Sequence, residues 1–195
     1  NKFSKRWAIN MELSQILQKS ISQIALSGQG VKTYLVPQIP RQLLTRAWRT
    51  FCPQEKRTSI LALIDTSFFQ NGKEGFVFTQ NALYIREAMH RVKVFPYDRI
   101  NAIIYFQALS TYSGKNSISM EIDSKDYDYE ISNVILKGVN TDRFNRMLQQ
   151  IVSLYRPDER HEIEEELEDS ETQIAHPEKF KPHKFKDGDP QIYQK

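Results

Sequence analysis

The sequence predicts an α+β protein in which an antiparallel β-sandwich or small barrel of about seven strands is capped by a C-terminal helix. Three observations carry this prediction. Short apolar segments rich in β-forming residues recur at roughly ten-residue spacing over residues 59–132. A one-faced helical pattern follows them, and two more precede them. We therefore expect three parts: an N-terminal two-helix extension at residues 1–57, a barrel with its capping helix at residues 58–156, and a flexible tail, acidic and then rich in Lys, Phe and Pro, at residues 157–195.

The composition is that of one globular domain with extensions. The chain has 195 residues, of which 39% are hydrophobic and 26% are charged, which is enough for one good core but not for two full domains. We find no apolar run of about 18 residues and no signal-peptide pattern, so we expect a cytoplasmic protein. The single cysteine, Cys52, excludes an internal disulfide, and we expect it to pack in the core rather than to react.

Two helices are expected before the strands. The first covers residues 11–25, where apolar side chains recur at helical spacing until glycines end the pattern. After a short extended piece at residues 33–36, Pro40 opens the second helix at a position where its missing N–H costs nothing, and Pro53 closes it. The apolar stripes are Leu13, Ile16, Leu17, Ile21 and Ile24 in the first helix and Leu44, Ala47, Trp48 and Phe51 in the second.

The strand region begins at Ser59 with the apolar run "SILALIDTSFF". "GFVFT" and "ALYIRE" follow, and the pair Gln80-Asn81 between them has the two-residue spacing that suits a hairpin. The remaining predicted strands are "HRVKVF", "NAIIYFQAL", "SISMEID" and "YDYEISNV". The last two alternate apolar and polar residues, as expected of strands with one buried face.

A C-terminal helix follows the strands. Asn140 or Thr141 can cap it, Asp142 is favourable in its first turn, and Pro157 ends it. Burial of its apolar side chains contributes roughly 1.5 to 3 kcal/mol each before entropy is subtracted, so we expect the helix to close the open end of the barrel. The stripe consists of Phe144, Met147, Leu148, Ile151 and Tyr155.

The strand region also resembles a known family. "LIDTSFFQNGKEGFVFTQNALYIRE" followed by "VFPYDRINAI" is similar to bacterial pleckstrin-homology-like (PH-like) domains, and "YLVPQIPRQLLTRA" resembles the helical segment that precedes such domains. The resemblance covers roughly residues 33–155. It implies a PH-like scaffold that binds a partner and carries out no reaction, since the matching motifs are structural.

The segment Gly72-Lys73-Glu74-Gly75 invites a phosphate-binding interpretation, which we reject in favour of a turn. PH domains that bind inositol phosphates cluster several Lys and Arg in this region, whereas residues 67–74 offer Lys73 beside an acid. A nucleotide P-loop requires Ser or Thr after the lysine and a helix rather than a strand. We expect the two glycines to supply the positive φ angles of a hairpin turn.

No catalytic or metal-binding pattern is evident. The histidines are scattered, G-x-S-x-G is absent, and the clustered carboxylates from Asp123 to Glu130 fall on a turn and on the solvent face of a strand. We therefore expect a protein that is not an enzyme and has no metal or cofactor.

Charge divides the chain into a basic body and an acidic tail. Residues 1–157 hold 21 Lys and Arg against 12 Asp and Glu, a balance of +9, whereas residues 158–195 hold 6 against 12, a balance of −6. A basic body favours an anionic partner. The candidate binding residues are Arg41, Arg46, Trp48, Arg49, Lys73, Arg86, Arg91, Lys93 and Arg99.

Two functions remain open from the sequence. We expect a binding or adaptor module that takes a protein partner, because PH-like barrels commonly bind peptides or helices. The alternative is an electrostatic binder of an anionic membrane surface or of nucleic acid through the basic N-terminal half. The acidic run at residues 158–171 is either a regulatory segment that screens the basic face or a solubilising linker.

Truncation after Tyr155 tests the regulatory role of the tail. We expect the shortened chain to bind an anionic partner more tightly and with a steeper salt dependence, because the acidic run no longer competes for the basic face. Titration with anionic vesicles or oligonucleotides at two salt concentrations measures both quantities. If neither the affinity nor its salt dependence changes, the tail does not screen the face.

Overall fold

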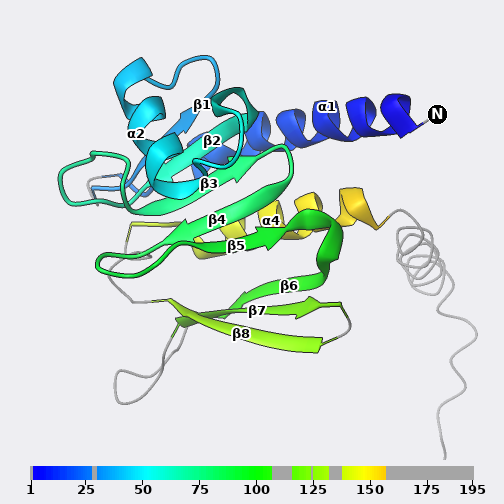
Figure 1. Ribbon diagram of the computed structural model, residues 1–195. Helices are drawn as coiled ribbons and strands as arrows, with labels where there is room; N and C mark the ends of the chain where they lie inside the picture. The colour runs from blue at the N-terminus through cyan, green and yellow to red at the C-terminus, as the bar shows by residue number, and fades with distance from the viewer. Residues whose placement is uncertain (1, 28–29, 107–115, 124, 132–137, 157–195) are drawn as a thin grey trace, which may run out of the picture. The chain divides into compact units, whose positions relative to one another are not determined.

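The computed structural model describes five stretches of the chain, residues 2–27, 30–106, 116–123, 125–131 and 138–156 (Figure 1). They belong to one unit, residues 1–157. The predicted tail and most of the predicted turn at residues 113–116 lie outside the described residues. The described part is α+β, as expected, with helices α1 (Lys2–Ser20), α2 (Arg41–Phe51) and α4 (Thr141–Tyr155) and two antiparallel sheets.

The two sheets contain five and three strands and follow the order of the chain. The first consists of β1 (Lys32–Leu35), β2 (Ile60–Asp65), β3 (Gly75–Thr79), β4 (Ala82–Arg86) and β5 (Lys93–Pro96). The second consists of β6 (Ile100–Phe106), β7 (Asn116–Ile122) and β8 (Lys125–Ile131).

The prediction of about seven strands is wrong by one in the described residues. The additional strand is β1, which was expected only as an extended piece and which pairs with β2 from Lys32 opposite Asp65 to Leu35 opposite Ala62. It was missed because its four residues show no clear alternation; pairing along the open edge of β2, rather than any local pattern, makes it a strand.

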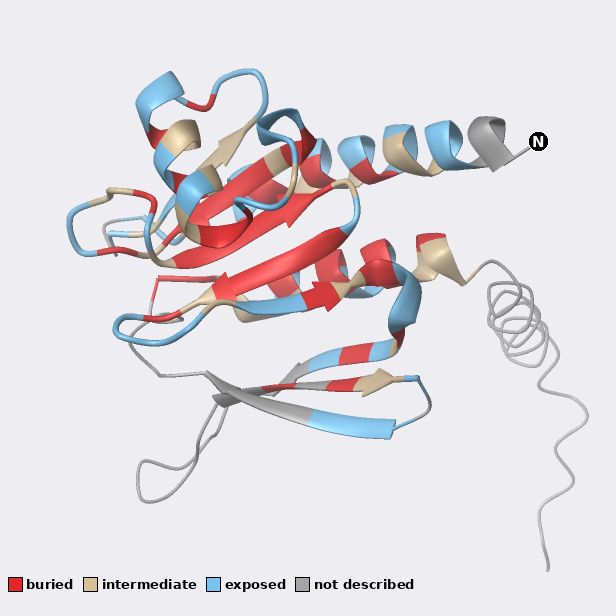
Figure 2. Cartoon of the chain, in the orientation of Figure 1, coloured by how far each residue is buried: buried red, intermediate tan, exposed pale blue. Residues whose placement is uncertain are grey.

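The three central strands of the five-stranded sheet, β2, β3 and β4, are buried on both faces, whereas the edge strands β1 and β5 are partly exposed (Figure 2). Helix α2 covers one face, where Leu43, Ala47 and Phe51 pack on side chains of β2, β3 and β4. The opposite face belongs to the main core, to which α1, α4 and the three-stranded sheet also contribute. Burial on both faces explains why "ILALID" and "GFVFT" read as continuous apolar runs rather than as alternating ones.

Helix α4 forms where the sequence predicts it. The Asn140 side chain accepts a hydrogen bond from the Arg143 backbone N–H at 3.1 Å, which confirms the cap. All members of the predicted stripe are buried except Tyr155, which is partly buried. The Phe144 ring lies 4.9 Å from the ring of Phe76 on β3, and the helix also packs along α1 and β6.

Helix α1 begins at Lys2 rather than at the predicted residue 11. Its buried residues Leu13 and Leu17 lie in the main core. The segment after it is fastened to the start of α4, because the Asn140 N–H donates to the Ile24 carbonyl at 2.7 Å and Ala25 forms a bridge with Val139. The first helix and the last are thus held together.

The buried face of α2 differs from the predicted stripe. Leu43 is buried, whereas Leu44 and Trp48 are only partly buried. The reason is the polar end of Trp48: its indole N–H donates to the Glu55 carbonyl at 2.7 Å, which keeps the ring at the border of the core.

The Gly-Lys segment is a turn, as predicted. Residues 66–74 connect β2 to β3 around the buried Asp65 carboxylate, which accepts hydrogen bonds from the Ser67 N–H at 3.0 Å, the Ser67 hydroxyl at 2.6 Å and the Gly72 N–H at 2.9 Å. Gly72 and Gly75 have φ angles of 70° and 118°. Glycine is needed at Gly75 in particular, because a Cβ there would lie 2.0 Å from the Ile64 carbonyl oxygen.

We expect Gly75→Ala to be among the most damaging single substitutions in the chain, with a loss of unfolding free energy of more than about 3 kcal/mol. Gly30→Ala is the matched control, because Gly30 has a φ of 76° but no atom within 4 Å of the added Cβ. There we expect about 1 to 2 kcal/mol. Urea denaturation measures both, and equal losses would show that the close approach at Gly75 is not what requires glycine.

Candidate functional site

Two loops meet at one end of the five-stranded sheet. Strands β2 and β4 run in the same direction, so the β2–β3 loop (residues 66–74) and the β4–β5 loop (residues 87–92) leave the sheet at the same end (Figure 1). They are joined directly, because the Arg86 Nη1 donates to the Lys73 carbonyl at 2.6 Å. We call these two loops, together with the strand residues Arg86 and Lys93 that flank the second loop, the loop end.

The loop end carries three large apolar side chains in water. Phe68 is 89% exposed, Phe69 is 80% exposed and Met89 is 98% exposed. The two phenyl rings contact each other edge to face at 5.1 Å. Apolar side chains gathered at neighbouring tips are typical of a surface that is covered by a partner.

Sequence reasoning missed these three residues. Phe68 and Phe69 were expected to continue the first strand, but β2 ends at Asp65, whose side chain turns the chain out of the sheet. The signal that was available is the polar sequence Asp65-Thr66-Ser67 directly before the two phenylalanines, since Asp and Ser favour turns. For Met89 the sequence offers no comparable signal.

Basic side chains surround the apolar tips. Of the predicted binding residues, the structure brings four to the loop end, of which three are exposed and Arg86 is half-buried between the loops. Lys32 was not predicted; it is exposed at the start of β1 and pairs opposite Asp65. The predicted residues at the loop end are Lys73, Arg86, Arg91 and Lys93.

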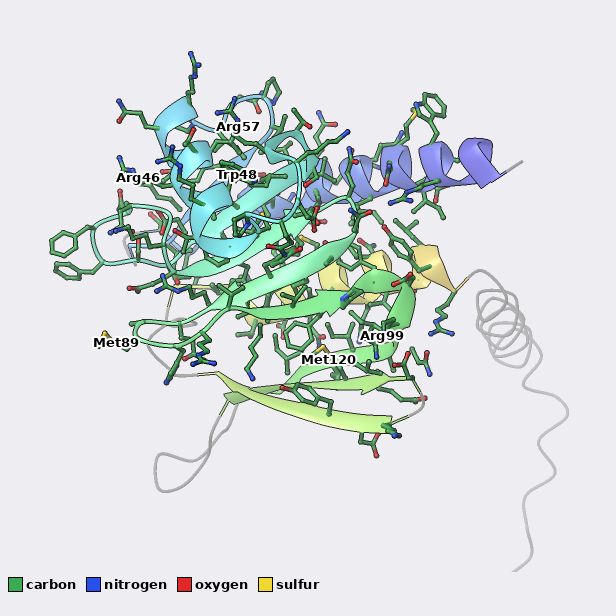
Figure 3. All side chains as sticks on the ribbon, viewed as in Figure 1. Arg46, Trp48, Arg57, Met89, Arg99 and Met120 are labelled. Carbon is green, nitrogen blue, oxygen red and sulfur yellow. The ribbon has the colours of Figure 1, made fainter. Side chains whose placement is uncertain are left out.

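Helix α2 adds cations beside the same loops. A Cβ on Gly72 would lie 2.7 Å from the Leu43 Cδ1, so the β2–β3 loop packs against the first turn of α2. Arg46 follows one turn later and is exposed, and Figure 3 shows Arg46 and Met89 projecting toward the same end of the sheet. Arg41 and Arg49 are also exposed on α2.

Trp48 and Arg99 are engaged elsewhere. Trp48 donates to the Glu55 carbonyl, as described above. Arg99 lies beyond β5, at the opposite end from the loops, and forms an exposed ion pair with Asp123, with its Nε donating to the Oδ2 at 3.0 Å. This hydrogen bond lowers the pKa of the Asp123 carboxyl below its usual value.

A polar network around Glu55 fixes the connection from α2 to β2. The Glu55 carboxylate accepts hydrogen bonds from the Ser59 hydroxyl at 2.7 Å, the Thr79 hydroxyl at 3.2 Å and the Tyr84 hydroxyl. Burial and then the hydrogen bond to Glu55 raise the pKa of Tyr84. Burial, followed by the charge of Glu55, raises the pKa of the Cys52 thiol to about 12. The packed thiol is what the sequence predicts.

The described stretches contain neither a metal-binding cluster nor a helix able to span a membrane. Within them, no group of three or more His, Cys, Asp or Glu side chains is placed to hold a metal ion. No helix there combines the length and the apolar character needed to cross a membrane.

Comparison of the chain with models of protein families, with curated proteins and with solved structures finds no match.

The state of Cys52 gives a direct test of the core beneath α2. We expect the native thiol to react with iodoacetamide at pH 8 at least about a thousand times more slowly than in urea, since burial excludes the reagent and the raised pKa leaves little thiolate. Mass spectrometry of timed samples measures the rate. Rapid alkylation of the native chain would contradict the packing of α2 on the sheet.

Proposed function

We propose that this chain is a non-catalytic binding module with a PH-like fold that docks on anionic membrane surfaces through the loop end. The observation that carries the proposal is the exposure of Phe68, Phe69 and Met89 on two joined loops surrounded by basic side chains. The PH-like part is supported by the order of the elements: the meander β2–β5 precedes the meander β6–β8, and α4 follows.

The basic and the apolar side chains make complementary contributions to the free energy of membrane binding. Each Lys or Arg near an anionic leaflet contributes about 1 kcal/mol, and this attraction weakens within a Debye length and with salt. A fully buried phenylalanine contributes roughly 1.5 to 3 kcal/mol, and this term does not depend on salt. Neither term alone gives stable anchoring, whereas a few apolar side chains together with a basic patch do.

The loop tips favour a membrane over nucleic acid. A phosphate backbone is bound by cations, and bases stack on the flat faces of aromatic rings. Phe68 and Phe69 instead meet edge to face, and Met89, the most exposed of the three, has no ring. This arrangement suits insertion between lipid headgroups, where apolar bulk counts and flatness does not.

The acidic run at residues 158–171 lies outside the described residues, so its screening of the basic face stays a prediction. The protein partner expected from the sequence also stays a proposal, and a second site described below supports it.

Sedimentation with vesicles tests the docking. We expect the full chain to bind phosphatidylcholine vesicles that contain phosphatidylglycerol, and to bind pure phosphatidylcholine at least about tenfold more weakly. Phe68→Ser with Phe69→Ser should reduce binding to anionic vesicles by about tenfold or more at every salt concentration, because it removes the apolar term. Lys73→Gln with Lys93→Gln should weaken binding mainly at low salt.

Two variants outside the loop end serve as controls. Trp7 on α1 is 67% exposed, so Trp7→Ser removes an exposed aromatic ring elsewhere and should leave vesicle binding unchanged. Arg99→Gln removes a cation at the opposite end and should also have no effect. If the Phe68/Phe69 variant binds vesicles as the original chain does, or if the chain prefers an oligonucleotide of equal charge to the vesicles, the membrane function is wrong.

A further inference from the structure

A pocket lies at the end of the sheet opposite the loop end. It has a volume of about 590 Å³ and lies where the β3–β4 turn, β5, the first half of α1 and the last turn of α4 meet. This volume falls within the range of about 300 to 1,000 Å³ that is usual for sites that bind small ligands or side chains. None of the residues at the loop end lines it.

The pocket combines apolar walls with two carboxylates. Its lining includes Tyr84, Tyr155 and Val94 and the acidic residues Glu55 and Asp98. Tyr84 is 2% exposed, and its hydroxyl donates to the Glu55 carboxylate. Aromatic faces and carboxylates are the two groups that attract a cation most strongly in proteins.

The sign of the charge in the pocket is opposite to that of the body around it. Among the residues that line the pocket, Glu55 and Asp98 are acidic and Arg6 is basic, and the Arg6 Nη2 donates to the Asn81 side-chain oxygen at 2.7 Å. Residues 1–157 as a whole carry a balance of +9. A pocket that is locally negative on a basic body selects a positive group at short range rather than by long-range attraction.

Next to the lining residue Tyr155 lies Tyr97, whose hydroxyl is buried. Tyr97 is buried, and among the described residues its hydroxyl has no hydrogen-bond partner. Its ring lies 5.3 Å from that of Tyr155. Burial and then the electrostatic influence of Tyr155, Glu55 and Tyr84 raise the pKa of Tyr97. An unpaired buried hydroxyl lowers stability, and Tyr97 itself is not among the residues that line the pocket.

The neighbouring strand edge favours a polypeptide over a free amine. Strand β5 is the edge strand of its sheet, and Val94, which is 44% exposed, lies on this edge and also lines the pocket. An extended segment beside an open edge can place one side chain of every two toward the same site.

We propose that this pocket binds the cationic side chain, an arginine or a lysine, of an extended segment from a partner protein. The aliphatic stem lies against the exposed side chain of Val94, and the positive group lies near Asp98, with the Glu55 carboxylate of the internal network adding to the attraction. Arg6, which lines the same pocket, opposes the incoming cation by its like charge. The site is independent of membrane docking, because the loop end and the pocket lie at opposite ends of the sheet.

Short peptides test this binding with the full chain. The probes are acetyl-Gly-Arg-Gly-amide, the same peptide with citrulline in place of arginine, and acetyl-Gly-Asp-Gly-amide. Titration followed by amide shifts of Ala82 and Val94 in NMR spectra gives the affinities. We expect the arginine peptide to bind about tenfold more tightly than the citrulline peptide, which has nearly the same shape but no charge, and the aspartate peptide to show no binding.

Substitution of charged residues in the pocket tests whether charge determines the affinity for the arginine peptide. Asp98→Asn should weaken binding of the arginine peptide about fivefold. Asp126 is an exposed acid on β8, and Asp126→Asn should leave the affinity unchanged. Arg6→Ala should strengthen binding of the arginine peptide by about two- to fivefold, because it removes the like charge. A purely structural role for Arg6 would not produce this gain.

Three results would overturn the proposal. Equal affinity for the arginine and citrulline peptides would show that charge is not recognised. Binding of the aspartate peptide that is lost in Arg6→Ala would assign the pocket to an anion instead. The absence of shifts at Ala82 and Val94 with any peptide at about 10 mM, well above the concentrations at which such sites fill, would show that the pocket is not a side-chain site.

Discussion

The burial of β2, β3 and β4 on both faces is the constraint on which the rest of the structure depends. Helix α2 removes one face of these strands from water, and α1, α4 and the second sheet remove the other. With both faces covered, the functional surfaces of this sheet are left to its ends and its edges. The exposed loop tips lie at one end, and the pocket lies at the other.

The sequence allowed the local elements to be predicted, because their signals are local. The Asn140 cap and the apolar stripe defined α4, the pair Gln80-Asn81 defined the hairpin, and the glycines of the Gly72 to Gly75 segment defined a turn. Strand β1 and the early start of α1 were not found. Both depend on contacts with residues far away in the chain, to which periodicity within a short window is insensitive.

In the candidate site, too, the sequence predicts local features but not those that depend on distant contacts. A basic side chain can be read from the sequence, but which basic side chains meet depends on the directions of the strands: β2 and β4 are parallel to each other, so Lys73 and Arg86 come together while Arg99 is carried to the far end. The exposure of Phe68 was not predicted, because a phenylalanine after a strand has the same pattern whether it enters the core or leaves it, and only the turn-forming residues before it point outward. The hydrogen bonds of Asp65 decide that outcome.

The contact between Ile24 and Asn140 has a consequence for synthesis on the ribosome. The apolar residues of α1, such as Leu13 and Leu17, emerge early, yet the helix that completes their burial is the last element of the unit to be made. Until α4 leaves the exit tunnel, the part of the main core that α4 covers stays exposed, and contacts so distant along the chain form slowly.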